Sequence, residues 1–168
     1  MRKMFVFIVL AWLLMTNATS ALTITEAQKC ADRLLEAYNS RSYPGKMLML
    51  EAITQRTFGM LYRSMTNQEK AEATKATKRV LRESFEQPTG QYQYKDMVVG
   101  PVETTKHGFR INGTVHITSP KYTGTASFMA LVYPGCKVEQ ARIGNIYALD
   151  IALREMLKKE SKWRDILG

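Results

Sequence analysis

Few side chains in this sequence could do acid–base chemistry, and none belongs to a recognised catalytic motif. Asp96 and Asp150 could act as a general acid or base if they pointed into an apolar cavity, because burial raises the pKa of a carboxyl group. For Asp150 the simpler interpretation is a helix cap. His107 falls in a predicted hairpin turn, and His116 lies on the polar side of a predicted strand. Without a GxSxG, HExxH or glycine-rich phosphate motif, we expect no enzyme, no cofactor and no metal site.

The sequence contains two cysteines, Cys30 and Cys136. In an oxidising compartment such a pair can form a disulfide. A disulfide requires the two Cα atoms to approach within about 7 Å, which sequence cannot show. The alternative is two buried, unpaired thiols that behave as small hydrophobic side chains.

The first residues have the layout of a secretory signal peptide. Arg2 and Lys3 precede an uncharged apolar run over residues 4–15, and Thr19-Ser20-Ala21 fits a cleavage site with small residues. The apolar run is shorter than the roughly 20 residues of a membrane-spanning helix. We therefore expect a signal peptide over 1–21, cleavage after Ala21 and a periplasmic mature protein. An uncleaved N-terminal anchor is the alternative.

Removing the signal peptide leaves residues 22–168, which is a typical length for one domain of roughly 100–150 residues. The full chain has a formal charge of +9, to which Arg2 and Lys3 contribute two. A basic protein can bind nucleic acid or an anionic membrane surface. Export argues against a nucleic-acid partner, and the basic residues are scattered along the chain, as on a solvated surface.

The N-terminal part of the domain shows helical periodicity. Thr25 can cap a first helix, with Gln28 as the partner in a capping box. After a connector rich in turn-forming residues, a second helix begins near Lys46 and includes Gly59. A glycine inside a helix marks a bend or a close helix crossing, since it costs about 1 kcal/mol relative to alanine.

The next helix has the clearest boundaries. Thr66 can take the N-cap position, and the carboxylate of Glu69 can reach back to its amide, which completes a capping box. The predicted helix covers residues 67–86, and Pro88-Thr89-Gly90 ends it.

The periodicity then changes to that of strands. Strands are predicted over residues 92–99, 109–118, 123–133 and 138–147, with Gly100-Pro101 closing the first. Residues 109–118 alternate between apolar and polar side chains, as in a half-buried strand. The run 128–132 is apolar on both parities, which is typical of a strand covered on both sides.

Helices followed by strands with short turns predict an α+β domain, in which N-terminal helices pack on a curved antiparallel sheet to form a cone. A C-terminal helix follows, with Ile151, Met156, Leu157, Trp163, Ile166 and Leu167 expected against the body. The chain has many apolar residues and few candidate catalytic groups. The apolar residues either line a cavity for an apolar ligand or fill the core.

The segment Tyr62–Glu69 resembles a pattern of the MlaC family, in which a tyrosine and a basic residue precede Ser-x-Thr-x-x-Gln. The members of this family are periplasmic phospholipid-binding proteins, also called toluene-tolerance proteins. Phe85, Tyr92 and Tyr94 follow in the order found in that family, and residues 111–117 and 137–150 resemble its strands. The similarity covers about Met49 to Leu153. This chain departs from the family in lacking a tryptophan in the last strand and in ending soon after one helix, which implies a smaller or more open cavity.

The resemblance implies a nuclear-transport-factor-like cone and a carrier that moves phospholipid, or another apolar ligand, between the outer membrane and an inner-membrane ABC transporter, thereby maintaining outer-membrane lipid asymmetry. It also implies an outer-membrane lipoprotein complex as a partner. The alternatives are a subunit of an envelope secretion machine, or an isomerase-like enzyme on the same cone. The residues expected to bind lipid are Phe58, Leu61, Tyr62, Leu81, Phe85, Phe109, Ile111, Val115, Ile117, Phe128, Ala130 and Val132.

Overall fold

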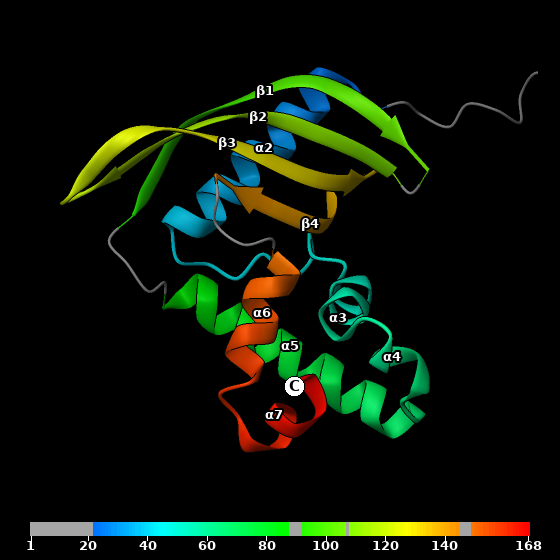
Figure 1. Ribbon diagram of the computed structural model, residues 1–168. Helices are drawn as coiled ribbons and strands as arrows, with labels where there is room; N and C mark the ends of the chain where they lie inside the picture. Colours follow the sequence, from blue (N-terminus) through cyan, green and yellow to red (C-terminus); the bar gives the residue numbers. More distant parts are fainter. Residues whose placement is uncertain (1–21, 88–91, 107, 145–148) are drawn as a thin grey trace, which may run out of the picture.

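A curved antiparallel sheet, with the helix over residues 24–39 packed on it, forms one layer of the structure, and the helices over residues 50–86 and 149–167 form a second, helical layer (Figure 1). The computed structural model describes residues 22–87, 92–106, 108–144 and 149–168. The predicted signal peptide, the predicted helix end at 88–90, His107 and the predicted strand end at 145–147 lie outside the described residues.

Helix α2 spans Ile24–Asn39 and begins two residues earlier than the sequence predicts. Thr23 is the N-cap and Glu26 completes the capping box, with the Glu26 carboxylate accepting the Thr23 amide at 2.9 Å. The predicted box of Thr25 and Gln28 is therefore wrong. Either threonine has the right chemistry, but only Thr23 has an acidic residue three positions later.

Two amide side chains fix α2 to strand β1, which spans Gln93–Thr105. Gln28 donates to the Met97 carbonyl at 2.5 Å and accepts the Val99 amide at 2.9 Å. Asn39 donates to the Tyr94 carbonyl at 2.7 Å and accepts the Tyr94 amide at 3.2 Å. Because β1 is an edge strand, these side chains satisfy backbone groups that have no neighbouring strand.

Gly59 ends the second predicted helix. Helix α3 spans Leu50–Phe58 and helix α4 spans Leu61–Ser64. The φ angle of Gly59 is +59°, a left-handed conformation that glycine adopts without steric cost. The sequence predicts one helix that includes Gly59, whereas the chain forms two helices with Gly59 between them.

Helix α5 spans Asn67–Glu86, as predicted. The Glu69 amide donates to the Thr66 hydroxyl, and the Glu69 carboxylate accepts the Thr66 amide at 2.7 Å, so the predicted capping box is confirmed.

The sheet has the order β1-β2-β3-β4, with β2 over Gly108–Ser119, β3 over Tyr122–Tyr133 and β4 over Lys137–Ile143. Strand β1 continues through Gly100-Pro101 to Thr105, past the predicted end. Proline is tolerated there because β1 is an edge strand and its pairing with β2 shifts between Val99 and Val102. Strand β3 lies between β2 and β4, and its residues 130–132 are all buried, as expected.

The connector between α2 and α3, residues 40–49, extends the sheet beside β4. The helix that the sequence predicts from near Lys46 therefore begins at Leu50. Leu48 forms a parallel bridge with Val138, supported by hydrogen bonds from the Met49 amide to the Val138 carbonyl and from the Val138 amide to the Met47 carbonyl. The chain therefore passes from the sheet layer into the helical layer at the β4 edge.

The C-terminal part contains two helices, α6 over Leu149–Leu157 and α7 over Ser161–Leu167. Their buried residues are Leu153, Leu157, Trp163 and Leu167, whereas Ile151 and Ile166 are exposed, contrary to the sequence-based expectation. No helix in the described ranges is long and apolar enough to cross a membrane. The α+β class with helices packed on a curved antiparallel sheet is confirmed.

Candidate ligand-binding site

One face of the sheet is apolar and turns toward the helices. In β2 the buried side chains alternate with polar ones, and the antiparallel register places Ile111 opposite Ala130 and Phe109 opposite Val132. Gly113 stands opposite Phe128, whose ring takes the space that a side chain at Gly113 would fill. All seven predicted sheet residues are buried on this face: Phe109, Ile111, Val115, Ile117, Phe128, Ala130 and Val132.

The helical layer supplies the opposing apolar side chains. Phe58, Tyr62 and Leu81 are buried in the same cluster as all of these sheet residues except Phe109, and Phe85 is half-buried against it. Leu61 is 38% exposed and is not part of this cluster. The break at Gly59 ends the helical spacing that would have placed Leu61 and Phe58 on one face.

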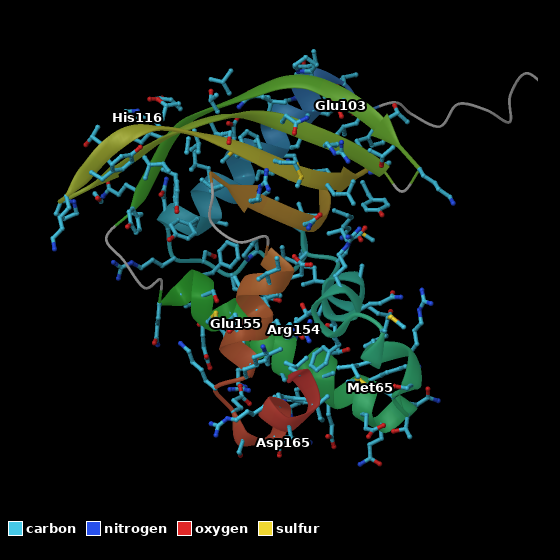
Figure 2. The ribbon with its side chains drawn as sticks, in the orientation of Figure 1. Met65, Glu103, His116, Arg154, Glu155 and Asp165 are labelled. Carbon is cyan, nitrogen blue, oxygen red and sulfur yellow. A yellow bond between two sulfur atoms is a disulfide. The ribbon has the colours of Figure 1, made fainter. Side chains whose placement is uncertain are left out.

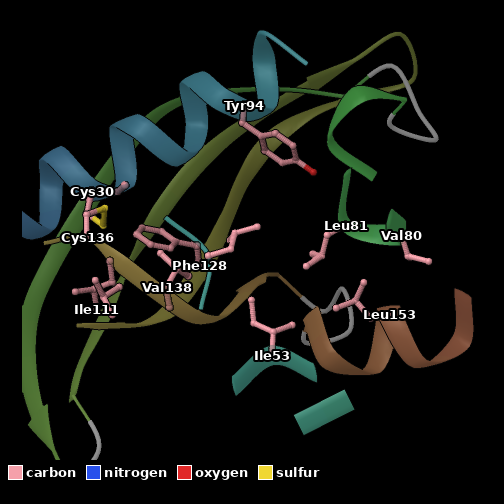
Figure 3. Packing of buried hydrophobic residues seen from close by; sticks show 14 of the residues in the cluster. Cys30, Ile53, Val80, Leu81, Tyr94, Ile111, Phe128, Cys136, Val138 and Leu153 are labelled. Carbon is pink, nitrogen blue, oxygen red and sulfur yellow. A yellow bond between two sulfur atoms is a disulfide. The ribbon is translucent and has the colours of Figure 1, made fainter. Parts of the chain in front are cut away.

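The two layers share one apolar interior. In Figure 3, Ile111, Phe128 and Val138 of the sheet lie on one side of the apolar cluster. Ile53, Leu81 and Leu153 of the helices lie on the other side. Helix α2 packs along β1 and makes the most extensive helix–sheet contact. The helical layer of α3 to α7 contacts the sheet along β4, through α3 and α6, and α5 touches α2 on the opposite side. The interior therefore lies between two apolar faces that are joined most tightly at one edge.

Four aromatic rings close the interior on the side of α2 and α5. Tyr38 makes edge-to-face contacts with Tyr94 at 4.8 Å and with Phe85 at 6.2 Å between ring centroids, and Tyr43 contacts Phe85 at 6.4 Å. Burial raises the pKa of Tyr38 and of Tyr94, so both phenols are neutral at physiological pH. These rings link α2, the connector, α5 and β1.

An open groove of about 740 Å³ lies beside these rings, between α2, the connector and α5. Its apolar floor includes Tyr43, Met47 and Leu50, which also pack against the interior cluster. Its basic side chains are Arg33 on α2, Lys46 on the connector, and Lys78 and Arg82 one turn apart on α5; Glu36 is the one carboxylate, and Ala37, Ser40, Ser42, Pro44 and Gly45 complete the lining. The groove thus combines an apolar floor with a positively charged rim.

A polar cluster joins the two layers at the opposite edge. The Glu139 carboxylate lies at a bulge in β4, where it pairs with Arg56 of α3 and accepts the Tyr133 hydroxyl at 2.5 Å. Burial and the hydrogen bond to Glu139 raise the pKa of Tyr133 to about 12. Because each member has a partner, we assign this cluster a structural role.

The acid–base candidates from the sequence do not come together. Asp96 is exposed on β1, and Asp150 lies in the first turn of α6. His116 projects from the convex side of the sheet, away from the helical layer (Figure 2). In the described part of the chain, no three His, Cys, Asp or Glu residues are grouped in a way that could hold a metal ion.

Cys30 of α2 and Cys136 of the β3–β4 hairpin form a disulfide, with a Cα–Cα distance of 5.4 Å. A smaller pocket of about 240 Å³ lies beside it, lined by Leu22, Glu26, Lys29, Cys30, Arg33, Pro134, Gly135 and Cys136. The disulfide links α2 to the hairpin between β3 and β4.

The sequence pattern does not single out the residues that form the groove. Tyr43 lies in the predicted connector, Met47 lies at the start of the second predicted helix, and Arg33 and Lys78 are two of many scattered basic residues. The available signal is the aromatic side chain of Tyr43 within a connector of turn-forming residues.

No protein-family model matches this chain, and no curated protein matches it. Among solved structures, the chain is similar to a phospholipid-binding protein from Ralstonia solanacearum that was solved in complex with a phospholipid. The TM-score is 0.54 at 11% sequence identity, and the match covers 88% of this chain and 92% of that chain. At this identity the similarity shows that the two proteins share a fold.

Proposed function

We propose that this protein binds a phospholipid and carries it through an aqueous compartment of the cell envelope. The observation that carries the proposal is the pair of facing apolar layers, joined most closely along β4, with an open groove beside the interior on the side of α2 and α5. The shared fold with a phospholipid-binding protein supports the same conclusion.

The physical task of such a carrier is to hide acyl chains from water. Each exposed methylene group costs about 0.8 kcal/mol, so a two-chain lipid does not cross an aqueous space unaided. The buried residues of β2 and β3 and the facing side chains of α3 and α5 offer the apolar surface that the chains need. Opening the layers on the α2–α5 side would admit the chains while the β4 edge stays closed.

The task requires no bond to be made or broken, and we propose that the protein is a carrier without enzymatic activity. We further propose that it works in the periplasm after cleavage near Leu22. An inner-membrane ABC transporter and an outer-membrane lipoprotein complex would then exchange lipid with it. The signal-like N-terminus and the resemblance to the MlaC family support this assignment. N-terminal sequencing of the exported protein tests it, since a sequence beginning at Met1 would contradict both cleavage and free diffusion.

The decisive experiment is mass spectrometry of organic extracts from the purified mature protein. We expect phospholipid at a substantial fraction of one molecule per protein, and none in extracts of an unrelated exported protein purified in the same way. Purified protein that carries no lipid and does not take up lipid from vesicles would contradict the proposal and favour a subunit of an envelope assembly.

A further inference from the structure

The groove between α2, the connector and α5 has a composition that suits one kind of chemical group. Its basic side chains come from three separate segments and converge on one opening, against the single carboxylate of Glu36. Arg33, Lys46 and Lys78 have no carboxylate within 4.0 Å among the described residues, so their charges are available to a ligand.

Local structure explains why these charges face one opening. Lys78 and Arg82 are four residues apart on α5, so they project from the same face of that helix. The Arg82 guanidinium lies 5.5 Å from the centre of the Tyr43 ring, which holds it over the connector. Arg33, Glu36 and Ala37 of α2 and its C-cap residue Ser40 also line the groove and follow the same three- and four-residue spacing.

The floor of the groove leads toward the apolar interior. Tyr43, Met47 and Leu50 line the groove and also pack against the buried cluster. A ligand with a charged group among the basic side chains could therefore pass its apolar part inward beside these three residues. A soluble phosphate ester would use the charges but not the apolar floor.

We propose that this groove binds the phosphate of an anionic phospholipid headgroup and makes the protein prefer anionic over zwitterionic lipids. The inference rests on the proposed function, because it assigns the headgroup end of the same ligand. Arg33, Lys46 and Lys78 have no ion-pair partner among the described residues, whereas Arg82 pairs with Glu86 at 3.7 Å. With three unpaired basic groups against the carboxylate of Glu36, a headgroup with a net negative charge gains more from the groove than one whose cation offsets its phosphate.

The test compares soluble ligands that differ only in the headgroup. Binding of dihexanoyl phosphatidylglycerol, dihexanoyl phosphatidylcholine and glycerophosphate is measured by calorimetry below the critical micelle concentration. We expect the wild type to prefer the phosphatidylglycerol and to lose this preference as salt is added, because exposed charges are screened. We expect glycerophosphate to bind far more weakly than either lipid.

The variants locate the effect. The double variant Arg33→Gln/Lys78→Gln should weaken phosphatidylglycerol binding by on the order of tenfold, as expected for two exposed charge contacts, and leave phosphatidylcholine binding almost unchanged. Lys75→Gln, which neutralises an exposed lysine on α5 outside the groove lining, should change neither.

Each failure has a distinct signature. Equal binding of the two lipids, or a loss in Lys75→Gln as large as in the double variant, would overturn the headgroup site and leave the carrier function in place. Failure of both lipids to bind would instead overturn the carrier function itself. Glycerophosphate binding as tight as that of the lipids would identify the ligand as a soluble phosphate ester and overturn the inference.

Discussion

The Arg56 guanidinium on α3 pairs with the Glu139 carboxylate on β4, so an ion pair joins the helical layer to the sheet at the edge where the layers meet. The Glu139 side chain is only 10% exposed, and its second oxygen accepts the Tyr133 hydroxyl. A bulge opposite Leu131 and Val132 places Glu139 in this position. In the proposed carrier, this edge is the one that stays closed when lipid enters.

Replacing Glu139 should weaken the junction. Glu139→Gln removes the charge that Arg56 and Tyr133 both use, and we expect the free energy of unfolding in urea to fall by roughly 1–3 kcal/mol. Glu103→Gln is the matched control. The Glu103 carboxylate is 53% exposed and its contact with Arg110 is 3.4 Å long, so its loss should cost less than about 0.5 kcal/mol. Equal losses for the two variants would show that the Glu139 cluster does not hold the layers together.

Stability should fall in alkaline solution. The pKa of Tyr133 is raised from 10.0 to about 12 in the folded protein, so folding favours the protonated phenol. That contribution is complete below pH 10 and is lost as the pH rises from 10 to 12. Burial raises the pKa of Tyr94 and acts in the same direction. Tyr133→Phe should make the decline in melting temperature shallower, whereas Tyr122→Phe, at an exposed tyrosine of β3, should not. Identical pH profiles for Tyr133→Phe and wild type would contradict this assignment.

Loss of the disulfide should destabilise the protein strongly. Cys30 and Cys136 are separated by 106 residues, and closing so long a loop stabilises the folded state by about 4–5 kcal/mol in the chain-entropy model. Cys30→Ser/Cys136→Ser, or wild type in reducing agent, should unfold at a correspondingly lower urea concentration. Thiol titration of the denatured, non-reduced protein should find no free thiol. Finding two would show that the bond does not form.

A charge placed on the inner face of the sheet should expel lipid. Val115 is fully buried on β2, whereas Val98 on β1 is 58% exposed. An unpaired carboxylate at Val115 is costly to bury, so Val115→Glu should lose co-purified phospholipid, and Val98→Glu should keep it. Thermal unfolding of the same samples separates loss of ligand from loss of fold. A folded Val115→Glu variant that keeps its lipid would contradict the carrier proposal. The proposal would also be contradicted if the wild type carries no lipid and the Val115→Glu variant unfolds.

Gly113 should not tolerate a side chain. A Cβ atom there would lie 2.1 Å from the Val98 carbonyl oxygen and 2.5 Å from a carbon of the Phe128 ring. We expect Gly113→Ala to lower the free energy of unfolding by roughly 1–3 kcal/mol, because the backbone of β1 cannot move away easily. Gly124→Ala is the control, since its nearest neighbour is the Tyr122 side chain, which can rotate away. If Gly113→Ala has the same melting temperature as wild type, the backbone of β1 does not approach Gly113 this closely.

Local patterns in the sequence determined most of the secondary structure. The capping box of Thr66 and Glu69 set the start of α5, and the alternation in residues 109–118 identified both β2 and its buried face. These features depend on residues within a few positions of one another. The order of helices and strands could therefore be predicted without knowledge of the tertiary structure. The errors in local structure also have local causes: Thr25 lacks the acidic partner that Thr23 has, and Gly59 adopts a conformation that ends a helix.

The tertiary structure alone decided which distant residues meet. Gln28 bonds to the backbone of β1, Cys30 reaches Cys136, and Arg56 reaches Glu139 because the layers pack in one particular way. The groove is the clearest case, since Arg33, Lys46 and Lys78 belong to three separate segments with no shared motif. Periodicity reports which face of an element is apolar, but it carries no information on which faces oppose each other. That pairing follows from burying all apolar faces at once, which only the folded chain can do.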